Sequence, residues 1–385
     1  MAFRSNRTGS TSMCLPKLRL PKIFVVSVLT ALIGLPISHA AAQDDAGETA
    51  ILQLQGIVEA WLSSPHADIT SQAFHHWDED GEIPATCATC HTSFGFIEYV
   101  RGAMDQAGIA PQAMPTGGVV DCAACHSEAS TALVSVPFPS GVSVDTFGSS
   151  ATCAVCHQGR AAGSTVAAAS EGMDEDTVSE DLGFINVHYA PSAATLMGSV
   201  TSGGFEYEGR EYRGQFTHVP DFATCTSCHQ PHSLEPVAME TCATCHQEAE
   251  TFEDIRTTRI DVDGDGDMSE GIADPIHTLH ERLYAAIQAY GTDVAGTAII
   301  YADQFPYFFT DTDGDGAVSE GEAAFPNRYA SWTPRLLKAA YNYQFIAKDH
   351  GAFAHNPHYA LQLLYDSLED LSGQVDVDMA AMARP

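Results

Sequence analysis

The sequence predicts a mainly α-helical fold with extensive loops and little β structure. Two features predict it. Four stretches repeat apolar residues at the three- and four-residue spacing of one helix face, and a block over 87–246 holds ten cysteines with little periodicity between them. With 385 residues, 45% of them hydrophobic, the chain is long enough for two or three domains with buried cores.

Residues 1–42 have the pattern of a signal peptide. This segment holds five basic residues, no acidic residue and a 15-residue apolar run over 23–37. The run is shorter than the roughly 20 residues of a membrane-spanning helix, and Ala40 or Ala42 offers a small residue for cleavage. We therefore expect an exported protein without a membrane span once the signal is removed. An uncleaved anchor is the alternative.

The chain is strongly acidic, with 50 Asp and Glu against 17 Lys and Arg and a formal charge of −33. Loss of the five basic residues of the signal leaves 12 against the same 50, a charge of −38. Such a chain repels nucleic acid and anionic membrane surfaces, so neither is an expected partner.

Apart from Cys14 in the signal segment, all cysteines belong to five copies of one pattern, in which a histidine directly follows a cysteine pair. The copies are Cys87, Cys90 and His91; Cys122, Cys125 and His126; Cys153, Cys156 and His157; Cys225, Cys228 and His229; and Cys242, Cys245 and His246. C-x-x-C-H is the attachment signature of c-type haem: two thiols on one turn form thioethers, and the histidine is the proximal iron ligand. Zinc sites and disulfides also use cysteine pairs, but neither requires a histidine after every pair. The sequence predicts five covalent haems.

The five motifs share 160 residues, or 32 per haem, so we expect the haems to form much of the core and to lie against one another. In the long interval before the fourth motif, aromatic residues flank Glu208-Gly209 and predict a small β-hairpin within 195–219. Little else before residue 250 is predicted to be regular.

Four apolar stripes predict helices that pack by one face. Their residues are Ile51, Leu54, Val58 and Trp61; Leu279, Leu283, Ile287 and Tyr290; Leu336, Leu337, Ala340 and Tyr341; and Leu361, Leu364, Tyr365, Leu368 and Leu371.

The motifs and their surroundings resemble those of bacterial multihaem c-type cytochromes. Cys228-His229-Gln230-Pro231-His232 looks like the C-H-x-P-H variant of that family, in which the second histidine serves a neighbouring haem. Also similar are Trp61 with Ser64-Pro65-His66, Phe74-His75-His76-Trp77, Asn186-Val187-His188-Tyr189 and His355-Asn356-Pro357-x-Tyr359. The resemblance implies an electron carrier of the periplasm or cell surface. The helical region with acidic loops after residue 250 departs from the simplest members.

The second axial ligand of each iron separates electron transfer from catalysis. Eleven histidines lie outside the motifs and the signal, more than five irons need. The distal candidates are His66, His76, His188, His218, His232 and His355. An iron with two histidine ligands has no open position for a substrate. Relatives that reduce nitrite often mark their open haem with a C-x-x-C-K motif, and this sequence has none, so we expect an electron carrier and not an enzyme.

The segment 311–322 fits the twelve-residue EF-hand calcium loop. Its expected ligands are Asp311, Asp313, Asp315, the backbone carbonyl of Ala317, and Glu322. Gly316 permits the sharp turn, although Pro306 argues against a regular incoming helix. A solvated acidic turn is the alternative.

A second acidic loop starts in the same way but ends differently. Asp261, Asp263, Asp265 and Asp267 are its expected calcium ligands, whereas position twelve is Ile272. Glu270 or a carboxylate from outside the loop would have to replace the missing ligand. We expect weaker binding here and a structural role for calcium.

Together these patterns predict a signal peptide (1–42), a haem-packed multihaem cytochrome domain (43–250) and a C-terminal helical region with EF-hand-like loops (251–385). The expected function is electron transfer with other redox proteins or extracellular acceptors, in the periplasm or at the cell surface. One alternative is an oxidoreductase that acts on a small nitrogen or sulfur oxyanion at one open haem. Another is an oligomer, a subunit of an extracellular cytochrome filament, in which a distal histidine comes from the next subunit.

Overall fold

The computed structural model describes residues 40–102, 104–220, 222–256 and 258–385. Most of the predicted signal peptide, residues 1–39, lies outside them. The chain divides into two compact units, Met1–Gln53 and Leu54–Pro385. Helix α1 (Ala40–Leu62) begins in the first unit and ends in the second. Over the described residues, no helix has both the length and the apolar character needed to cross a membrane.

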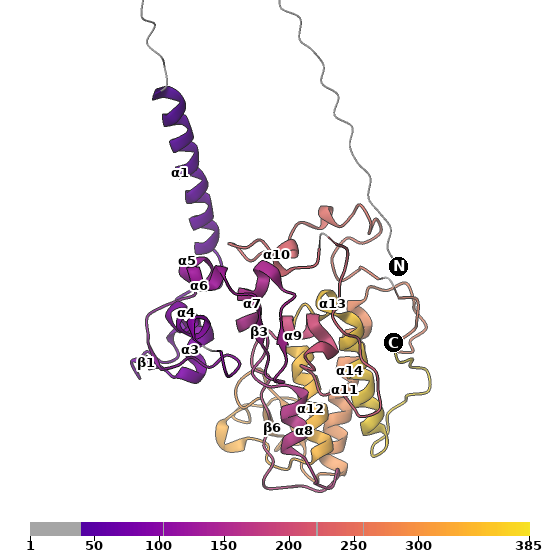
Figure 1. Ribbon diagram of the computed structural model, residues 1–385. Helices are drawn as coiled ribbons and strands as arrows, with labels where there is room; N and C mark the ends of the chain where they lie inside the picture. The colour runs from indigo at the N-terminus through magenta and orange to yellow at the C-terminus, as the bar shows by residue number, and fades with distance from the viewer. Residues whose placement is uncertain (1–39, 103, 221, 257) are drawn as a thin grey trace, which may run out of the picture. The chain divides into compact units, whose positions relative to one another are not determined.

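We call residues 54–250 of the second unit, which hold the five cysteine motifs, the haem-motif region. It consists of short helices and turns joined by long loops (Figure 1). The helices are α2 (Gln72–His75), α3 (Ala85–His91), α4 (Ser93–Arg101), α5 (Cys122–His126), α6 (Glu128–Thr131), α7 (Ala151–Cys156), α8 (Gly163–Ala169), α9 (Ser192–Met197) and α10 (Cys225–Cys228), with 3-10 turns η1 (Gly148–Ser150), η2 (Gly198–Val200) and η3 (Met239–Thr241). Two antiparallel strand pairs join β1 (Glu82–Ile83) to β2 (Met114–Pro115) and β3 (Val136–Pro137) to β4 (Ser143–Val144). The region is more helical than the sequence analysis predicted, because the first four cysteine motifs each lie in a short helix.

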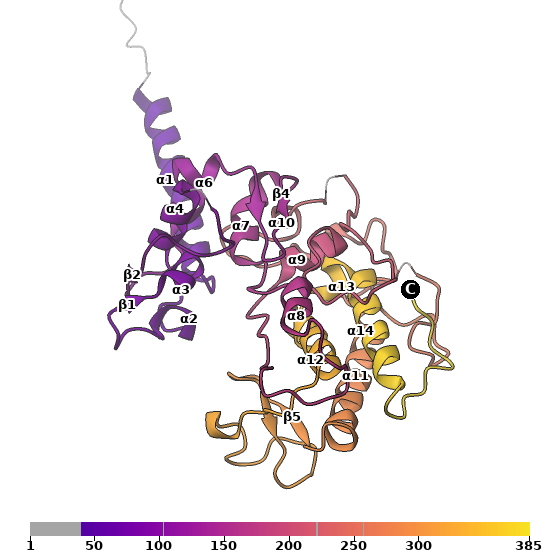
Figure 2. The same cartoon turned by 60° about the horizontal axis from the view of Figure 1, so that its bottom comes forward.

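Three longer helices lie side by side in the C-terminal region: α11 (Ala273–Asp293), α12 (Pro334–Ala347) and α14 (Pro357–Ser372) (Figures 1 and 2). Thr333 caps α12 by accepting a hydrogen bond from the Leu336 amide. Pro334 lies in the first turn, where a backbone N–H would have no partner within the helix, so the missing N–H of proline costs no hydrogen bond. The remaining elements are strands β5 (Ile299–Tyr301) and β6 (Phe308–Thr310), which pair antiparallel, the turn η4 (Phe325–Asn327) and the short helix α13 (Ala352–His355).

The predicted apolar faces of α11, α12 and α14 lie in the core, where Leu279, Leu337 and Leu364 are fully buried. The mainly helical fold with little β structure is therefore confirmed. The stripe of α1 behaves differently, because Leu54 and Val58 are 60% and 40% exposed. The helix was predicted correctly, but its role as core packing was not.

The β-hairpin predicted within 195–219 is wrong. The segment starts with α9 and η2 and continues without strands, although a turn is present where the Arg210 amide bonds the Tyr207 carbonyl. Its two arms share the backbone bonds from Ser199 N to Arg213 O at 3.0 Å and from Phe216 N to Leu196 O at 2.8 Å, without forming strands, and other backbone groups bond side chains of other elements. The amides of Gly204, Phe205 and Arg213 donate to Tyr359 Oη, Asn342 Oδ1 and Gln362 Oε1. These acceptors on α12 and α14 take the place of a strand ladder.

One hydrophobic core connects the haem-motif region with the C-terminal helices. It includes Phe96, Val155 and Val187 together with Leu283, Phe345 and Leu361. The predicted domain boundary near residue 250 stays a prediction.

Candidate haem centres and acidic loops

Each of the five cysteine motifs closes a helical turn. The first two lie within α3 and α5, and in the others the histidine amide bonds the carbonyl of the first cysteine at 2.8–3.0 Å. The turn brings both thiols and the imidazole of a motif close together. All ten motif cysteines are free of disulfides and are half-buried or exposed, and thioether formation to a haem requires free, accessible thiols.

Each motif histidine faces the ring of a second histidine. The pairs and their centroid distances are His91 and His188 at 5.9 Å, His126 and His232 at 6.2 Å, His157 and His66 at 6.3 Å, His229 and His355 at 6.4 Å, and His246 and His218 at 5.8 Å. A metal–imidazole nitrogen bond is about 2.0 Å long and the ring centroid lies roughly 1.2 Å farther out, so two imidazoles on opposite sides of one metal have centroids roughly 6.4 Å apart. The spacings therefore fit an iron held between each pair.

Five of the six predicted distal candidates are brought to a motif histidine in this way. The sixth, His76, instead stands edge-on to the Trp77 ring at 4.9 Å. Two of the histidines outside the motifs have other protein partners: His277 pairs with Glu281, and His280 bonds the Tyr343 carbonyl. The structure therefore separates five of the candidates from the rest by their surroundings.

The pair of His126 and His232 joins two different motifs. His232 directly follows Pro231 in the C-H-x-P-H segment of the fourth motif, yet its ring faces His126 of the second motif. This placement agrees with the family resemblance, in which the second histidine of such a segment serves a neighbouring haem.

Burial lowers the pKa of some of these imidazoles, which favours the neutral form that binds a metal. Burial and, to a smaller extent, the neighbouring His157 lower the pKa of His66 to about 4. Burial likewise lowers the pKa of His188 to about 4, with smaller contributions from His91 and two nearby cations.

The protein holds the Nδ1 atom of the ring in several cases. His91 Nδ1 bonds the Ala73 carbonyl at 2.7 Å, and His229 Nδ1 bonds the Leu234 carbonyl at 3.1 Å. His355 differs, because its Nδ1 donates to the carboxylate of Asp349 at 2.7 and 3.0 Å. The sequence analysis missed Asp349, and no local pattern marks it.

The third motif lies at the centre of the motif contacts. The Cys156 thiol interacts with Cys90 of the first motif, and the Cys153 thiol with Cys225 of the fourth. Thr152, just before the third motif, bonds the Cys125 thiol of the second. The Cys228 thiol of the fourth motif interacts electrostatically with the Cys242 thiol of the fifth.

In the loop 311–322, the carboxylates of Asp311, Asp313 and Asp315 converge, with one oxygen from each lying within 4.8 Å of the others. Asp311 also accepts hydrogen bonds from the Gly314 and Gly316 amides at 2.6 and 2.9 Å, which shape the turn. Glu322 is folded back over the loop and accepts the Thr312 and Ser319 amides at 2.6 and 3.0 Å. Strand β6 precedes this loop, in agreement with the expectation that Pro306 prevents an incoming helix.

In the loop that starts at Asp261, the carboxylates of Asp261, Asp263 and Asp265 converge in the same way. Asp263 is 1% exposed, and neither of its carboxylate oxygens has a hydrogen-bond partner. A buried carboxylate without a partner is costly, so this site favours a cation. Glu270 does not turn into the loop but pairs with Arg256 at 3.0 Å, and Ile272 is buried. Asp267 accepts the Ser269 amide at 2.7 Å.

Helical C-x-x-C-H turns that face further histidines are typical of multihaem c-type cytochromes. Comparisons with known proteins agree with this class. Residues 72–158 match the family model of cytochrome c7 and related cytochrome c.

Two polyhaem cytochromes of Geobacter sulfurreducens are distant relatives of the chain. It is 25% identical over 414 residues to the C-type polyheme cytochrome OmcB, a match that covers 89% of this chain and 52% of that protein. It is 26% identical over 396 residues to the C-type polyheme cytochrome OmcC, with coverage of 84% and 48%. The chain thus spans about half the length of the curated relatives it matches. No solved structure matches it.

Proposed function

We propose that the protein is an exported electron-transfer cytochrome that binds five covalent c-type haems, each with two histidine ligands from the same chain. The observation that carries this proposal is the set of five histidine pairs with centroid distances of 5.8–6.4 Å. The proximal ligands are the motif histidines, and the distal ligands are His188, His232, His66, His355 and His218 in motif order. Its partners are other redox proteins or extracellular acceptors, in the periplasm or at the cell surface.

The five intrachain pairs favour an electron carrier over the two alternatives. An oxyanion-reducing enzyme needs an iron with an open position, and a filament of the kind considered needs a distal histidine from another subunit. With a partner for every motif histidine within one chain, neither an open iron nor a borrowed ligand is required.

The motif contacts support a branched electron path. The third haem is the junction, because its motif contacts the first and fourth motifs through thiols and the second through Thr152. The fifth haem follows the fourth. Three haems would then form ends at which an electron can enter or leave.

Both acidic loops are proposed to bind calcium. The convergence of three carboxylates supports both sites, and the partnerless, buried Asp263 supports the second in spite of its missing twelfth ligand. Bound calcium stabilises the C-terminal region by mass action.

Haem content and ligation are tested on the purified holoprotein. A pyridine haemochrome assay is expected to give five haems per chain after denaturation, and the dithionite-reduced protein is expected not to bind carbon monoxide. His232→Ala should convert one low-spin haem to high-spin, whereas the control His76→Ala should leave the spectra unchanged. Three or fewer haems, or stoichiometric binding of carbon monoxide, would refute the proposal.

Calcium is tested by melting the holoprotein with added calcium and with chelator. Calcium is expected to raise the melting temperature, and Asp263→Asn and Asp311→Ala should each remove part of that increase. An exposed acid outside the loops, Glu248, provides the control Glu248→Gln. Equal melting curves with calcium and with chelator would show that the loops are solvated turns.

A further inference from the structure

The second-sphere contact of His355 distinguishes it from the other candidate iron ligands. Its Nδ1 donates to both oxygens of Asp349, at 2.7 and 3.0 Å. The Nδ1 atoms of His91 and His229 instead bond neutral backbone carbonyls. Among the ten paired histidines in the described chain, His355 alone has an ion pair with a carboxylate.

Asp349 is well placed to act on this ring. Its side chain is 1% exposed, so its charge is little screened by water. Ser192 Oγ and the Gly351 amide also bond Oδ1, at 3.4 and 3.3 Å, and hold the carboxylate in place. A side chain at Gly351 would collide with the His355 ring, since an added Cβ would lie 2.6 Å from its Cε1. The loop is therefore shaped to hold His355 against Asp349.

The surroundings of the first haem pair have the opposite charge. Arg160 and Lys348 both act electrostatically on His188, and Arg160 also acts on His91. Lys348 is buried, its ammonium pairs with Asp303, and its Nζ lies 4.3 Å from the centre of the Tyr189 ring, next to His188. The first pair therefore lies near Arg160 and near a lysine whose charge Asp303 partly compensates, whereas the pair of His229 and His355 lies against the carboxylate of Asp349.

Ferric haem carries one positive charge more than ferrous haem, so a nearby anion stabilises the ferric form and a cation destabilises it. A carboxylate that accepts the Nδ1 proton also makes the imidazole a stronger donor to the metal. The nearby anion and the hydrogen bond to Nδ1 therefore both lower the reduction potential of the haem. We infer that Asp349 is a positioning residue that gives the haem of His229 and His355 the lowest reduction potential of the set. This inference rests on the histidine ligation proposed above.

The direct test is a potentiometric titration of the holoprotein, followed by absorption and electron paramagnetic resonance. Asp349→Asn keeps a hydrogen-bonding side chain but removes the charge. It is expected to favour reduction of one haem at least tenfold, a rise of about 59 mV for a one-electron couple, and to change the g-values of that haem. Asp349→Glu should restore the lower potential in part. The control Glu235→Gln removes an exposed charge near the fourth motif and should shift no potential comparably.

A second measurement does not depend on the stability of the Asp349 variant. His355→Ala should abolish the low-spin signal that titrates at the most negative potential in the unmodified protein. The inference about Asp349 would be overturned if His355→Ala removed a signal with a higher potential, or if a correctly ligated Asp349→Asn protein kept all its potentials. Either result would leave the proposed histidine ligation in place. If His355→Ala changes no low-spin signal, the ligand assignment itself fails.

Discussion

The C-terminal helices and the segment 211–250 bury their side chains to very different degrees. Most residues of α12 and α14 are buried, whereas no described residue of 211–250 is. Both belong to the same compact unit. The difference indicates that protein side chains form the core of the helical region, whereas around the fourth and fifth motifs the proposed haems would form it.

The largest expected effect is the loss of haem. A chain with all motif cysteines replaced by serine should lose structure over 217–250 and keep α11, α12 and α14, because 217–250 has no buried described residue, whereas Tyr212 and Arg213 contact the core and α14. By hydrogen exchange, amides of 217–250 should exchange at close to unfolded rates, and those of the three helices at least about 100-fold more slowly. Equal protection of amides in both regions, or equal loss of protection, would contradict the idea that only the C-terminal helices have a core of protein side chains.

A smaller effect is expected from Asn342, which is fully buried on α12. Its Oδ1 accepts the Phe205 amide at 2.7 Å and its Nδ2 donates to the Phe205 carbonyl at 2.9 Å. Asn342→Ala leaves both backbone groups without partners and should lower the free energy of unfolding by about 2–4 kcal/mol. Denaturant unfolding measures this, with Gln374→Ala, an exposed amide beyond α14, as the control.

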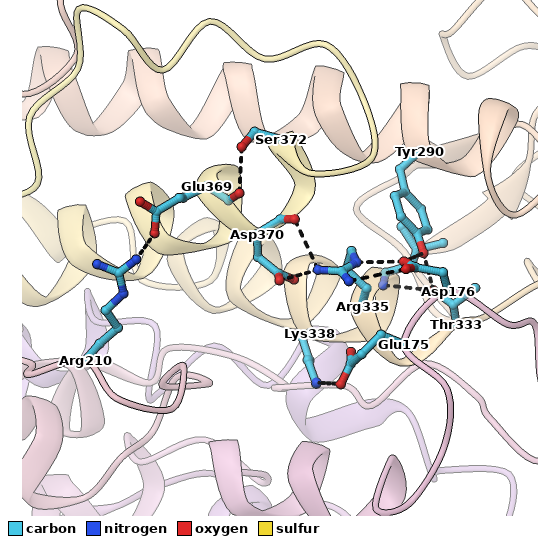
Figure 3. Close-up of polar contacts among 11 residues, drawn as sticks. Glu175, Asp176, Arg210, Tyr290, Thr333, Arg335, Lys338, Glu369, Asp370 and Ser372 are labelled. Carbon is cyan, nitrogen blue, oxygen red and sulfur yellow. Dashed lines mark hydrogen bonds and ion pairs between the residues drawn. The ribbon is translucent and has the colours of Figure 1, made fainter.

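The next smaller effect on the free energy of unfolding is expected from Arg335. It bridges the loop residue Asp176 and Asp370 on α14, and Tyr290 also donates to Asp176 at 2.7 Å (Figure 3). Arg335→Met should cost about 2 kcal/mol, because it leaves two partly buried carboxylates without their cation. An unchanged unfolding curve would show that the bridge adds nothing.

This contribution should also depend on pH. The hydrogen bond from Arg335 lowers the pKa of Asp176 below its usual range. The resulting stability is present above the unfolded pKa, about 3.9, and is lost as the pH falls through the lower folded value. The difference between Arg335→Met and the unmodified protein should therefore narrow below about pH 4.

The smallest effect is expected at Glu369, whose ion pair with Arg210 is also visible in Figure 3. Both side chains are 40% exposed, so solvent and salt screen the pair. Glu369→Gln should change the free energy of unfolding by less than about 1 kcal/mol, and by less still in 1 M salt. A larger loss would mean that this surface contact is part of the core-like packing of α14.

The sequence by itself determined the features that depend on neighbouring residues. The cysteine pairs and proximal histidines are adjacent in the chain, and one helical turn brings them together. The same holds for the carboxylates of the acidic loops and for the apolar faces of α11, α12 and α14. Local spacing is sufficient in these cases because the chemistry is contained within one turn, one loop or one helix face.

Only the tertiary structure decided what lies far apart in the chain. The paired histidines are separated by 28 residues for His218 and His246 and by 126 for His229 and His355. Apart from the C-H-x-P-H segment that marks His232, no local rule selects the distal members over His76. The predicted hairpin failed for the same reason, since side chains of α12 and α14 offered its backbone other acceptors. The role of Asp349 likewise depends on the tertiary structure, because the loop around Gly351 places its carboxylate against the His355 ring. Long-range packing sets such contacts, and the sequence pattern of one segment does not contain them.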